Sequence, residues 1–275
     1  MAENNQPKSF SNSVQLEKYA ADLAKVYNSE KQKRKELEAA NQQLLKYADD
    51  LNNIMLEIKA SNQALQKAYL DTINRLVLAA EFKDEDTGDH IMRMARYSAL
   101  IAEKLGLPAR DVRNILYAAP MHDVGKIGIP DSILMKPGKL TAEEFEIMKS
   151  HTTIGAKILA NSEAEILNVA EQIALSHHEK WNGKGYPQGL SGNEIPLFGR
   201  IVGLADVFDA LTSRRPYKNP FSVEVALDII KNDRGKHFDP EVVDVFLENI
   251  DEVLQIKASV NSFLESFPYL MGVDI

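Results

Sequence analysis

The chain contains no cysteine among its 275 residues. No disulfide can therefore form, and zinc sites built from thiolates are excluded, as are catalytic cysteine nucleophiles. The absence does not identify a compartment, although it is consistent with a reducing cytoplasm.

Long apolar runs are also absent, and we find no stretch of the length that a membrane-spanning helix needs. The first ten residues are polar and lack the apolar segment of a secretory signal peptide. We therefore expect neither secretion nor a membrane partner, and we predict a cytoplasmic protein.

Basic residues are fewer than acidic ones. The chain has 32 lysines and arginines and 40 aspartates and glutamates, which gives a formal net charge of −8. This balance argues against nucleic acid as a partner, since nucleic-acid binders normally present a basic face. An anionic substrate remains possible, because bound metal cations can reverse the field around a site. The hydrophobic share of 44% is that of a soluble globular protein with a packed core.

Apolar residues recur every seven positions in the N-terminal quarter of the chain, in a stretch without glycine or proline. Glu30 interrupts one series, which consists of Leu16, Leu23, Leu37, Leu44, Leu51, Ile58 and Leu65. Lys33 and Ser61 interrupt the second, which consists of Tyr19, Val26, Ala40, Tyr47, Ile54 and Ala68. The pattern predicts a coiled coil that forms a homodimer. A long amphipathic helix that folds back on its own domain is the alternative.

Shorter helical segments separated by glycine and proline follow from about residue 72. We predict helices at 72–82, 90–105, 111–121, 141–150, 152–160, 169–178, 200–212, 222–232 and 240–250. Thr141 followed by Glu144 has the pattern of a capping box, and Asp239 before Pro240 has that of an N-cap. Convincing strand alternation is absent, so the predicted fold is all-α, with a long N-terminal coiled-coil helix followed by a helical bundle. The expected divisions are a disordered N-terminus at 1–15, the coiled coil at 16–71, the bundle at 72–255 and a C-terminal extension at 256–275.

Five of the six histidines and two aspartates occur in an ordered series, namely His90, His122, Asp123, His151, His177, His178 and Asp206. Neutral imidazoles and carboxylates suit iron, manganese and zinc, and a carboxylate can bridge two ions. Each histidine taken alone is more often structural than a metal ligand, and spacing does not decide between the two roles, because ligands so far apart in sequence have no local geometry to test. The sixth histidine, His237, precedes a capped helix and is assigned to a structural loop.

Three segments have a more specific pattern. They are MHDVGKIGIPDSILMKPGKLTAEEFEIMKSH at 121–151, HHEKWNGKGYPQGLSGNEIP at 177–196 and RIVGLADVFDALTSRRPYK at 200–218. These segments resemble the HD-GYP family of bacterial cyclic di-nucleotide phosphodiesterases, and KHFDPEVVDVFL at 236–247 resembles the C-terminal portion of that family. The His-Asp pair alone would indicate only the broader HD phosphohydrolase superfamily, whereas the run after it and Gly185-Tyr186-Pro187 select this family.

The resemblance implies an HD-type helical bundle, at 72–255, with a metal centre in its core. All seven residues of the ordered series stand at ligand positions of the family, and Asp123 would be the bridging carboxylate. Two or three divalent ions are implied, iron or manganese in identity. Asp86 stands where some members place a carboxylate, usually Glu, for a third metal; an N-cap or loop acid is the alternative.

The resemblance also implies a substrate site. Lys126, Arg215 and Lys218 match positions that face the substrate phosphates, and Tyr186 lies in a loop at the lip of the active site, where it would meet substrate or a partner domain. Surface charges and an ordinary turn are the alternative explanations. Asn182 departs from the family pattern, which often has an acid there.

The implied activity is metal-dependent hydrolysis of cyclic di-GMP to linear pGpG and on to GMP, with Asp123 and Lys126 as catalytic residues. The implied partners are cyclic di-GMP, a second copy of the chain and a regulatory or GGDEF-type domain. Two alternatives stay open. One is hydrolysis of another cyclic dinucleotide such as cyclic GMP-AMP, and the other is a catalytically silent nucleotide-sensing adaptor that acts through its coiled coil.

Overall fold

The first element is a single helix of 73 residues, α1 (Ser9–Glu81), which contains no glycine or proline to break it. The structure, a computed structural model, describes residues 9–81, 83, 88–213 and 219–259. Because α1 is unbroken, the helix predicted to start at residue 72 is its continuation. α1 also includes residues 9–15, which the sequence assigned to a disordered N-terminus, whereas residues 1–8 lie outside the described part.

The chain divides into two compact units, Met1–Gln66 and Lys67–Ile275. In the first unit the heptad residues are 55–71% exposed; they are Leu16, Leu23, Leu37, Leu44, Leu51, Ile58 and Leu65. Pairs one turn apart support the helix locally, for example Arg34 Nε and Glu38 Oε1 at 3.2 Å. Such exposed pairs contribute little to the stability of the helix. Most of the stabilisation of α1 must therefore come from packing of its apolar seam.

Within the second unit, the end of α1 becomes part of a core. Leu70, Ile73, Val77 and Ala80 are buried, and their spacing of three and four residues places them on one helical face. The change in sequence pattern near residue 70 therefore marks the point where α1 becomes buried, and the helix itself continues.

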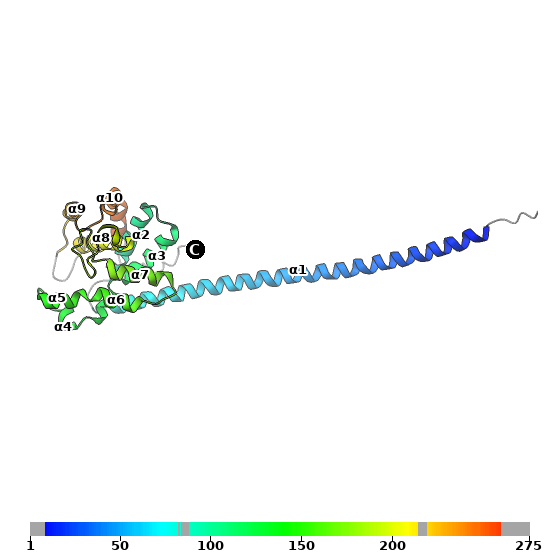
Figure 1. Cartoon of the computed structure of the whole chain (residues 1–275), viewed down its shortest axis with the longest axis horizontal. Coiled ribbons are helices and arrows are strands. Elements are labelled where there is room, and N and C mark those ends of the chain that lie inside the picture. Colours follow the sequence, from blue (N-terminus) through cyan, green and yellow to red (C-terminus); the bar gives the residue numbers. More distant parts are fainter. Residues whose placement is uncertain (1–8, 82, 84–87, 214–218, 260–275) are drawn as a thin grey trace, which may run out of the picture. The chain divides into compact units, whose positions relative to one another are not determined.

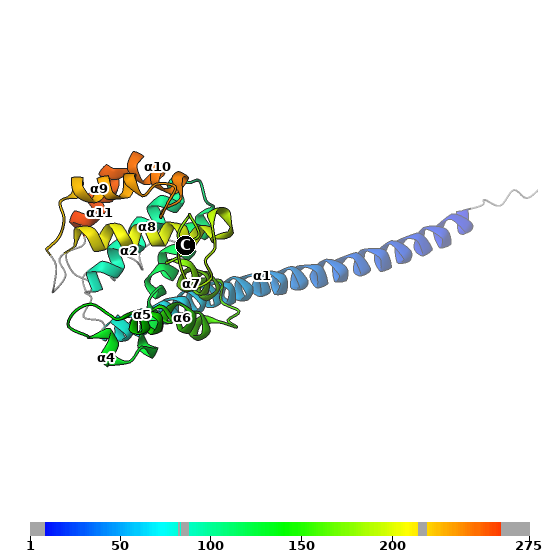
Figure 2. The same cartoon turned by 60° about the vertical axis from the view of Figure 1, so that its left-hand side comes forward.

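Four helices form the centre of the second unit, namely α2 (Gly88–Lys104), α3 (Ala109–Ala118), α7 (Glu165–Ser176) and α8 (Leu197–Thr212). α2 packs against α3 and α8, and α7 packs against the same two helices (Figure 1). Figure 2 shows the C-terminal helices beside α2 and α8; they are α9 (Val223–Asn232), α10 (Pro240–Glu248) and α11 (Ile250–Ser259). α6 (His151–Leu159) packs on α7. The remaining short elements are η1 (Ala119–Met121), η2 (Val124–Gly128), α4 (Asp131–Leu134), α5 (Ala142–Lys149) and η3 (Gly192–Glu194).

An aromatic series joins three of these helices. Tyr97 on α2, Phe208 on α8 and Phe246 on α10 are fully buried, with ring centroids 5.6 Å apart for the first pair and 5.0 Å for the second. Burial of each large side chain contributes about 1.5–3 kcal/mol. The contact between α2 and α8 matters most for function, because both helices carry candidate ligands.

The described residues contain only two isolated bridges, Asn182 with Ser191 and Arg234 with Phe238, and no strand, which confirms the all-α prediction. Both predicted caps are present: Thr141 and Glu144 form a capping box, and Asp239 accepts a hydrogen bond from the amide of Glu241. Sequence analysis missed α4 and α11. In the described residues, we find no helix with the length and apolar character needed to cross a membrane.

Candidate metal centre

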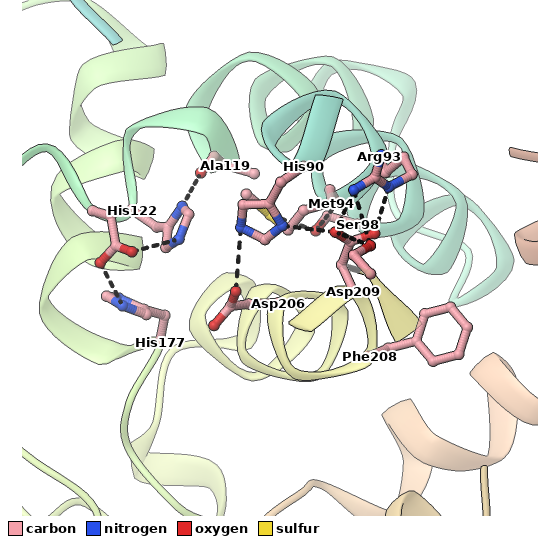
Figure 3. Close-up of polar contacts among 12 residues, drawn as sticks. His90, Arg93, Met94, Ser98, Ala119, His122, His177, Asp206, Phe208 and Asp209 are labelled. Atoms are coloured by element: carbon pink, nitrogen blue, oxygen red, sulfur yellow. Dashed lines mark hydrogen bonds and ion pairs between the residues drawn. The ribbon is translucent and has the colours of Figure 1, made fainter. Parts of the chain in front are cut away.

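His90 and Asp206 are brought together by the packing of α2 on α8. His90 lies in the first turn of α2, and its Nε2 is 3.5 Å from Oδ1 of Asp206. Its other ring nitrogen, Nδ1, is 2.8 Å from Oδ2 of Asp209, one turn further along α8 (Figure 3). The imidazole is thus held on one side by Asp209 while its Nε2 faces Asp206.

Asp209 is anchored in turn by a guanidinium. Nε of Arg93 donates to Oδ1 at 2.7 Å and its Nη2 donates to Oδ2 at 2.8 Å (Figure 3). The hydroxyl of Ser213 donates to Oδ2 at 3.0 Å. Sequence analysis missed both Asp209 and Arg93. The available signal was their spacing, because each follows a predicted ligand on its helix by three residues and so shares its face.

His122 and Asp123 lie between the short turns η1 and η2. The two oxygens of Asp123 face different imidazoles, with Oδ2 3.1 Å from Nε2 of His122 and Oδ1 3.2 Å from Nε2 of His151. Nε2 of His177 also approaches Oδ1, at 3.6 Å. A carboxylate placed in this way has one oxygen available to each of two neighbouring sites.

Close backbone packing holds this segment against α6. A Cβ on Gly125 would lie 1.8 Å from the carbonyl oxygen of His151, so only glycine fits. The ammonium of Lys83 donates to the carbonyls of Ile127 and Ile129, at 2.8 Å each. Lys83 was also missed, since nothing in the sequence connects it with a segment more than forty residues away.

Main-chain carbonyls determine which nitrogen of three imidazoles is protonated. Nδ1 of His122 lies 3.1 Å from the carbonyl of Ala119, Nδ1 of His151 lies 2.7 Å from that of Met148, and Nδ1 of His177 lies 3.0 Å from that of Ile173; each acceptor is in the preceding turn. A carbonyl only accepts, so Nδ1 must be the donor. Each ring consequently presents the lone pair of Nε2, as a metal ligand requires.

The seven predicted ligands form two groups within the described residues. Asp123, His151, His177 and His178 make up one group, and His90, His122 and Asp206 make up the other. In each group the ligand atoms lie within 4.8 Å of one another. The contact between Asp123 and His122 joins the two groups.

The donor set fits divalent metal ions. In the described part of the chain, Nε2 of His151, Nε2 of His177 and Oδ1 of Asp123 are buried without a hydrogen-bond partner. Buried polar atoms normally have partners, because leaving them without one costs about 1–3 kcal/mol each. Lone pairs that converge in this way are compensated when they bind a cation, and imidazole with carboxylate suits first-row metals.

The ionisation states agree with this role. Burial opposes the ionised form of Asp123, but its neighbours, the ammonium of Lys126 foremost, outweigh burial and hold the pKa of Asp123 well below its ordinary value. Burial, reinforced by His177, lowers the pKa of His178 well below its ordinary value, and burial also lowers the pKa of His177. Near neutral pH these groups are an anionic carboxylate and neutral imidazoles, the forms that bind metals.

Lys126 and Tyr186 lie beside the group that contains Asp123. Nζ of Lys126 is 2.8 Å from Oδ2 of Asp123. The ring of Tyr186 is 4.7 Å from that of His178, between centroids, and burial raises the pKa of the Tyr186 hydroxyl, which therefore stays protonated.

The turn that carries Tyr186 is held by Glu179, another residue that sequence analysis missed. Oε1 of this buried carboxylate accepts hydrogen bonds from the amides of Gln188 and Gly189, at 2.7 and 3.1 Å.

Three predicted site residues, Asp86, Arg215 and Lys218, lie outside the described residues. His237 belongs to neither metal group and stacks on Phe238, with ring centroids 4.3 Å apart.

Known proteins are similar to this chain in sequence. A cyclic di-GMP phosphodiesterase of Thermotoga maritima is 50% identical over 186 residues, which are 68% of this chain and 50% of that protein. A 3'3'-cGAMP-specific phosphodiesterase of Vibrio cholerae is 42% identical over 208 residues, or 76% of this chain and 38% of that protein. The chain thus spans about half, or less, of the length of these relatives.

The chain also resembles a solved structure and matches a protein family. The structure of a cyclic GMP-AMP specific phosphodiesterase of Vibrio cholerae superimposes with a TM-score of 0.55 and 22% identity, over 75% of this chain and 54% of that one, and shows a common fold. The family described as HD domain matches residues 64–242, which include every ligand of both metal groups. The chain belongs to the HD domain family.

Proposed function

We propose that this chain is a metal-dependent phosphodiesterase that hydrolyses cyclic di-GMP to linear pGpG and on to GMP. The observation that carries the proposal is the pair of adjacent His/Asp groups, which are joined by the contact between Asp123 and His122. The 50% identity to a protein named cyclic di-GMP phosphodiesterase supports the choice of substrate. A cytoplasmic location is part of the proposal, because this substrate is an intracellular messenger.

Each residue of the site has a proposed role. The seven ligands would hold two ions, iron or manganese, and Asp86 would help to hold a third. Divalent ions bound there supply Lewis acidity and a water of lowered pKa. Asp123 orients both groups through its two oxygens, and Lys126, with its ammonium beside Asp123, neutralises charge on the substrate phosphate. Arg215 and Lys218 are proposed as further phosphate contacts, and Tyr186 as a substrate contact.

Hydrolysis by the purified chain tests the proposal. After anaerobic loading with manganese or iron, we expect cyclic di-GMP to be converted to pGpG and GMP, and we expect chelator treatment to stop the reaction. Chromatography resolves the products. Full metal occupancy without turnover would overturn the proposal.

Cyclic GMP-AMP is the second candidate substrate, favoured by the 42% identity to a 3'3'-cGAMP-specific enzyme. Competition between the two cyclic dinucleotides separates the candidates by their relative kcat/KM. The complete set of seven ligands disfavours a silent adaptor, since a degenerate site is expected to lose ligands.

The chain is further proposed to form a homodimer through α1, and a regulatory or GGDEF-type domain is proposed as its partner. Two apolar series at heptad spacing, exposed along α1, support the dimer. We expect Leu51→Glu to convert the dimer to a monomer in light scattering, because it places a charge in the seam. Leu56→Glu is the matched control, since Leu56 is similarly exposed, at 58% against 61%, but lies outside the seam. A monomeric wild-type chain would contradict the prediction.

A further inference from the structure

α5 presents apolar side chains that do not serve a core. None of its residues is buried, and Phe145 and Ile147 are 46% and 43% exposed. The helix is held by polar interactions at its N-terminus, where Glu144 caps the amide of Thr141 and contacts the ammonium of Lys136 at 2.6 and 2.8 Å. The ring of Phe145 is therefore accessible on a helix that does not depend on it for a buried core.

Phe145 lies next to the metal centre through Tyr186. The rings of Phe145 and Tyr186 meet edge to face, with centroids 6.1 Å apart. Tyr186 in turn lies 4.7 Å from the ring of His178 and 6.4 Å from that of His151. Aromatic surface therefore extends from the candidate ligands to the exposed α5. A nucleobase is separated from its phosphate by one ribose, so a phosphate held among these ligands can place its base on this surface.

A cation accompanies the two rings. Nζ of Lys149 lies 5.5 Å from the centroid of Phe145 and 5.8 Å from that of Tyr186. Lys149 also pairs with Glu146, at 2.5 Å, but the Glu146 side chain is 70% exposed, so giving up this contact costs little. An ammonium only donates hydrogen bonds. Guanine offers two adjacent acceptors, O6 and N7, whereas adenine offers a donor beside N7.

We propose that Phe145, Tyr186 and Lys149 form a purine subsite, in which the base stacks on the exposed ring of Phe145 beside Tyr186 and Lys149 donates to O6 and N7 of guanine. The subsite rests on the proposed function, because it assigns one base of the same substrate. It makes Phe145 and Lys149 determinants of specificity, in addition to the residues that hold metal and phosphate.

Binding of mononucleotides to the metal-loaded full-length chain tests the subsite without requiring turnover. Calorimetry would compare GMP, AMP and ribose 5-phosphate. We expect GMP to bind about tenfold more tightly than ribose 5-phosphate, which is the scale of one stacking contact between a base and an aromatic ring. Phe145→Ala should reduce this difference by the stacking contribution, and Lys149→Met should bring GMP to the affinity of AMP. Ile147→Ala on the same helix and Lys157→Met on α6 are matched exposed controls that should change neither value.

Kinetics supply the second measurement. With cyclic di-GMP, Phe145→Ala should raise KM about tenfold with kcat nearly unchanged, because stacking is equal in the ground and transition states. Equal binding of GMP and ribose 5-phosphate to the wild type, or an unchanged KM in Phe145→Ala, would overturn the subsite. If no cyclic dinucleotide is hydrolysed but Phe145→Ala still weakens the binding of GMP relative to ribose 5-phosphate, the subsite stands and the proposed function fails.

Discussion

Asp123→Ala is expected to abolish hydrolysis of cyclic di-GMP, lowering kcat/KM by about a thousandfold or more, since activation of the attacking water depends on the metal centre. The variant should also retain less metal than the wild type. Asp123 is the residue whose two oxygens reach imidazoles in both groups, His122 on one side and His151 on the other. Its loss therefore affects both groups together, whereas loss of a single histidine affects one.

Metal analysis by mass spectrometry and steady-state hydrolysis would be measured on the same preparation. Asp251→Ala is the matched control, because Asp251 is an exposed aspartate on α11. The control should keep wild-type metal content and activity. An Asp123→Ala protein with full metal content and at least a tenth of wild-type activity would refute the role of Asp123.

Asp209→Asn is expected to lower metal affinity by about 10–100-fold, although Asp209 is not a proposed ligand. The carboxylate accepts from Nδ1 of His90 and so orients Nε2 toward Asp206. It also accepts hydrogen bonds from Nε and Nη2 of Arg93, whose side chain is 11% exposed. An asparagine cannot accept from all these donors, so the buried guanidinium would lose its compensating charge. We expect a loss of about 3–5 kcal/mol in the free energy of unfolding.

The chain offers a control with the same geometry and a different environment. Asp244 forms a two-pronged pair with Arg234, at 2.7 and 2.6 Å, in which both side chains are nearly half exposed. Asp244→Asn should therefore change stability much less than Asp209→Asn does, because solvent screens an exposed pair. Thermal denaturation measures the effect on stability. Metal titration at a temperature well below the Tm of both the wild type and Asp209→Asn measures the effect on metal affinity. A lower Tm with unchanged metal affinity would leave Asp209 a structural residue only.

The helical part of the fold was well predicted where periodicity and capping signals agree. Thr141 and Asp239 cap the helices that they were expected to cap. The predicted start at residue 72 was wrong because a change in the pattern of burial was interpreted as a break, while no glycine or proline interrupts α1. α4 was missed because four residues are too few to show a helical period.

The amino-acid sequence by itself determined the helical class, the heptad seam of α1 and, through the family motifs, the identity of the seven candidate ligands. Tertiary structure alone decided how these ligands divide into two groups, which ring nitrogen of His122, His151 and His177 is protonated, and that Asp209, Lys83 and Glu179 support the site. The physical reason is the distance along the chain over which each kind of interaction acts. Helical period and capping depend on residues within one or two turns, whereas Asp209 lies 119 residues from His90 and meets it only because α2 packs on α8.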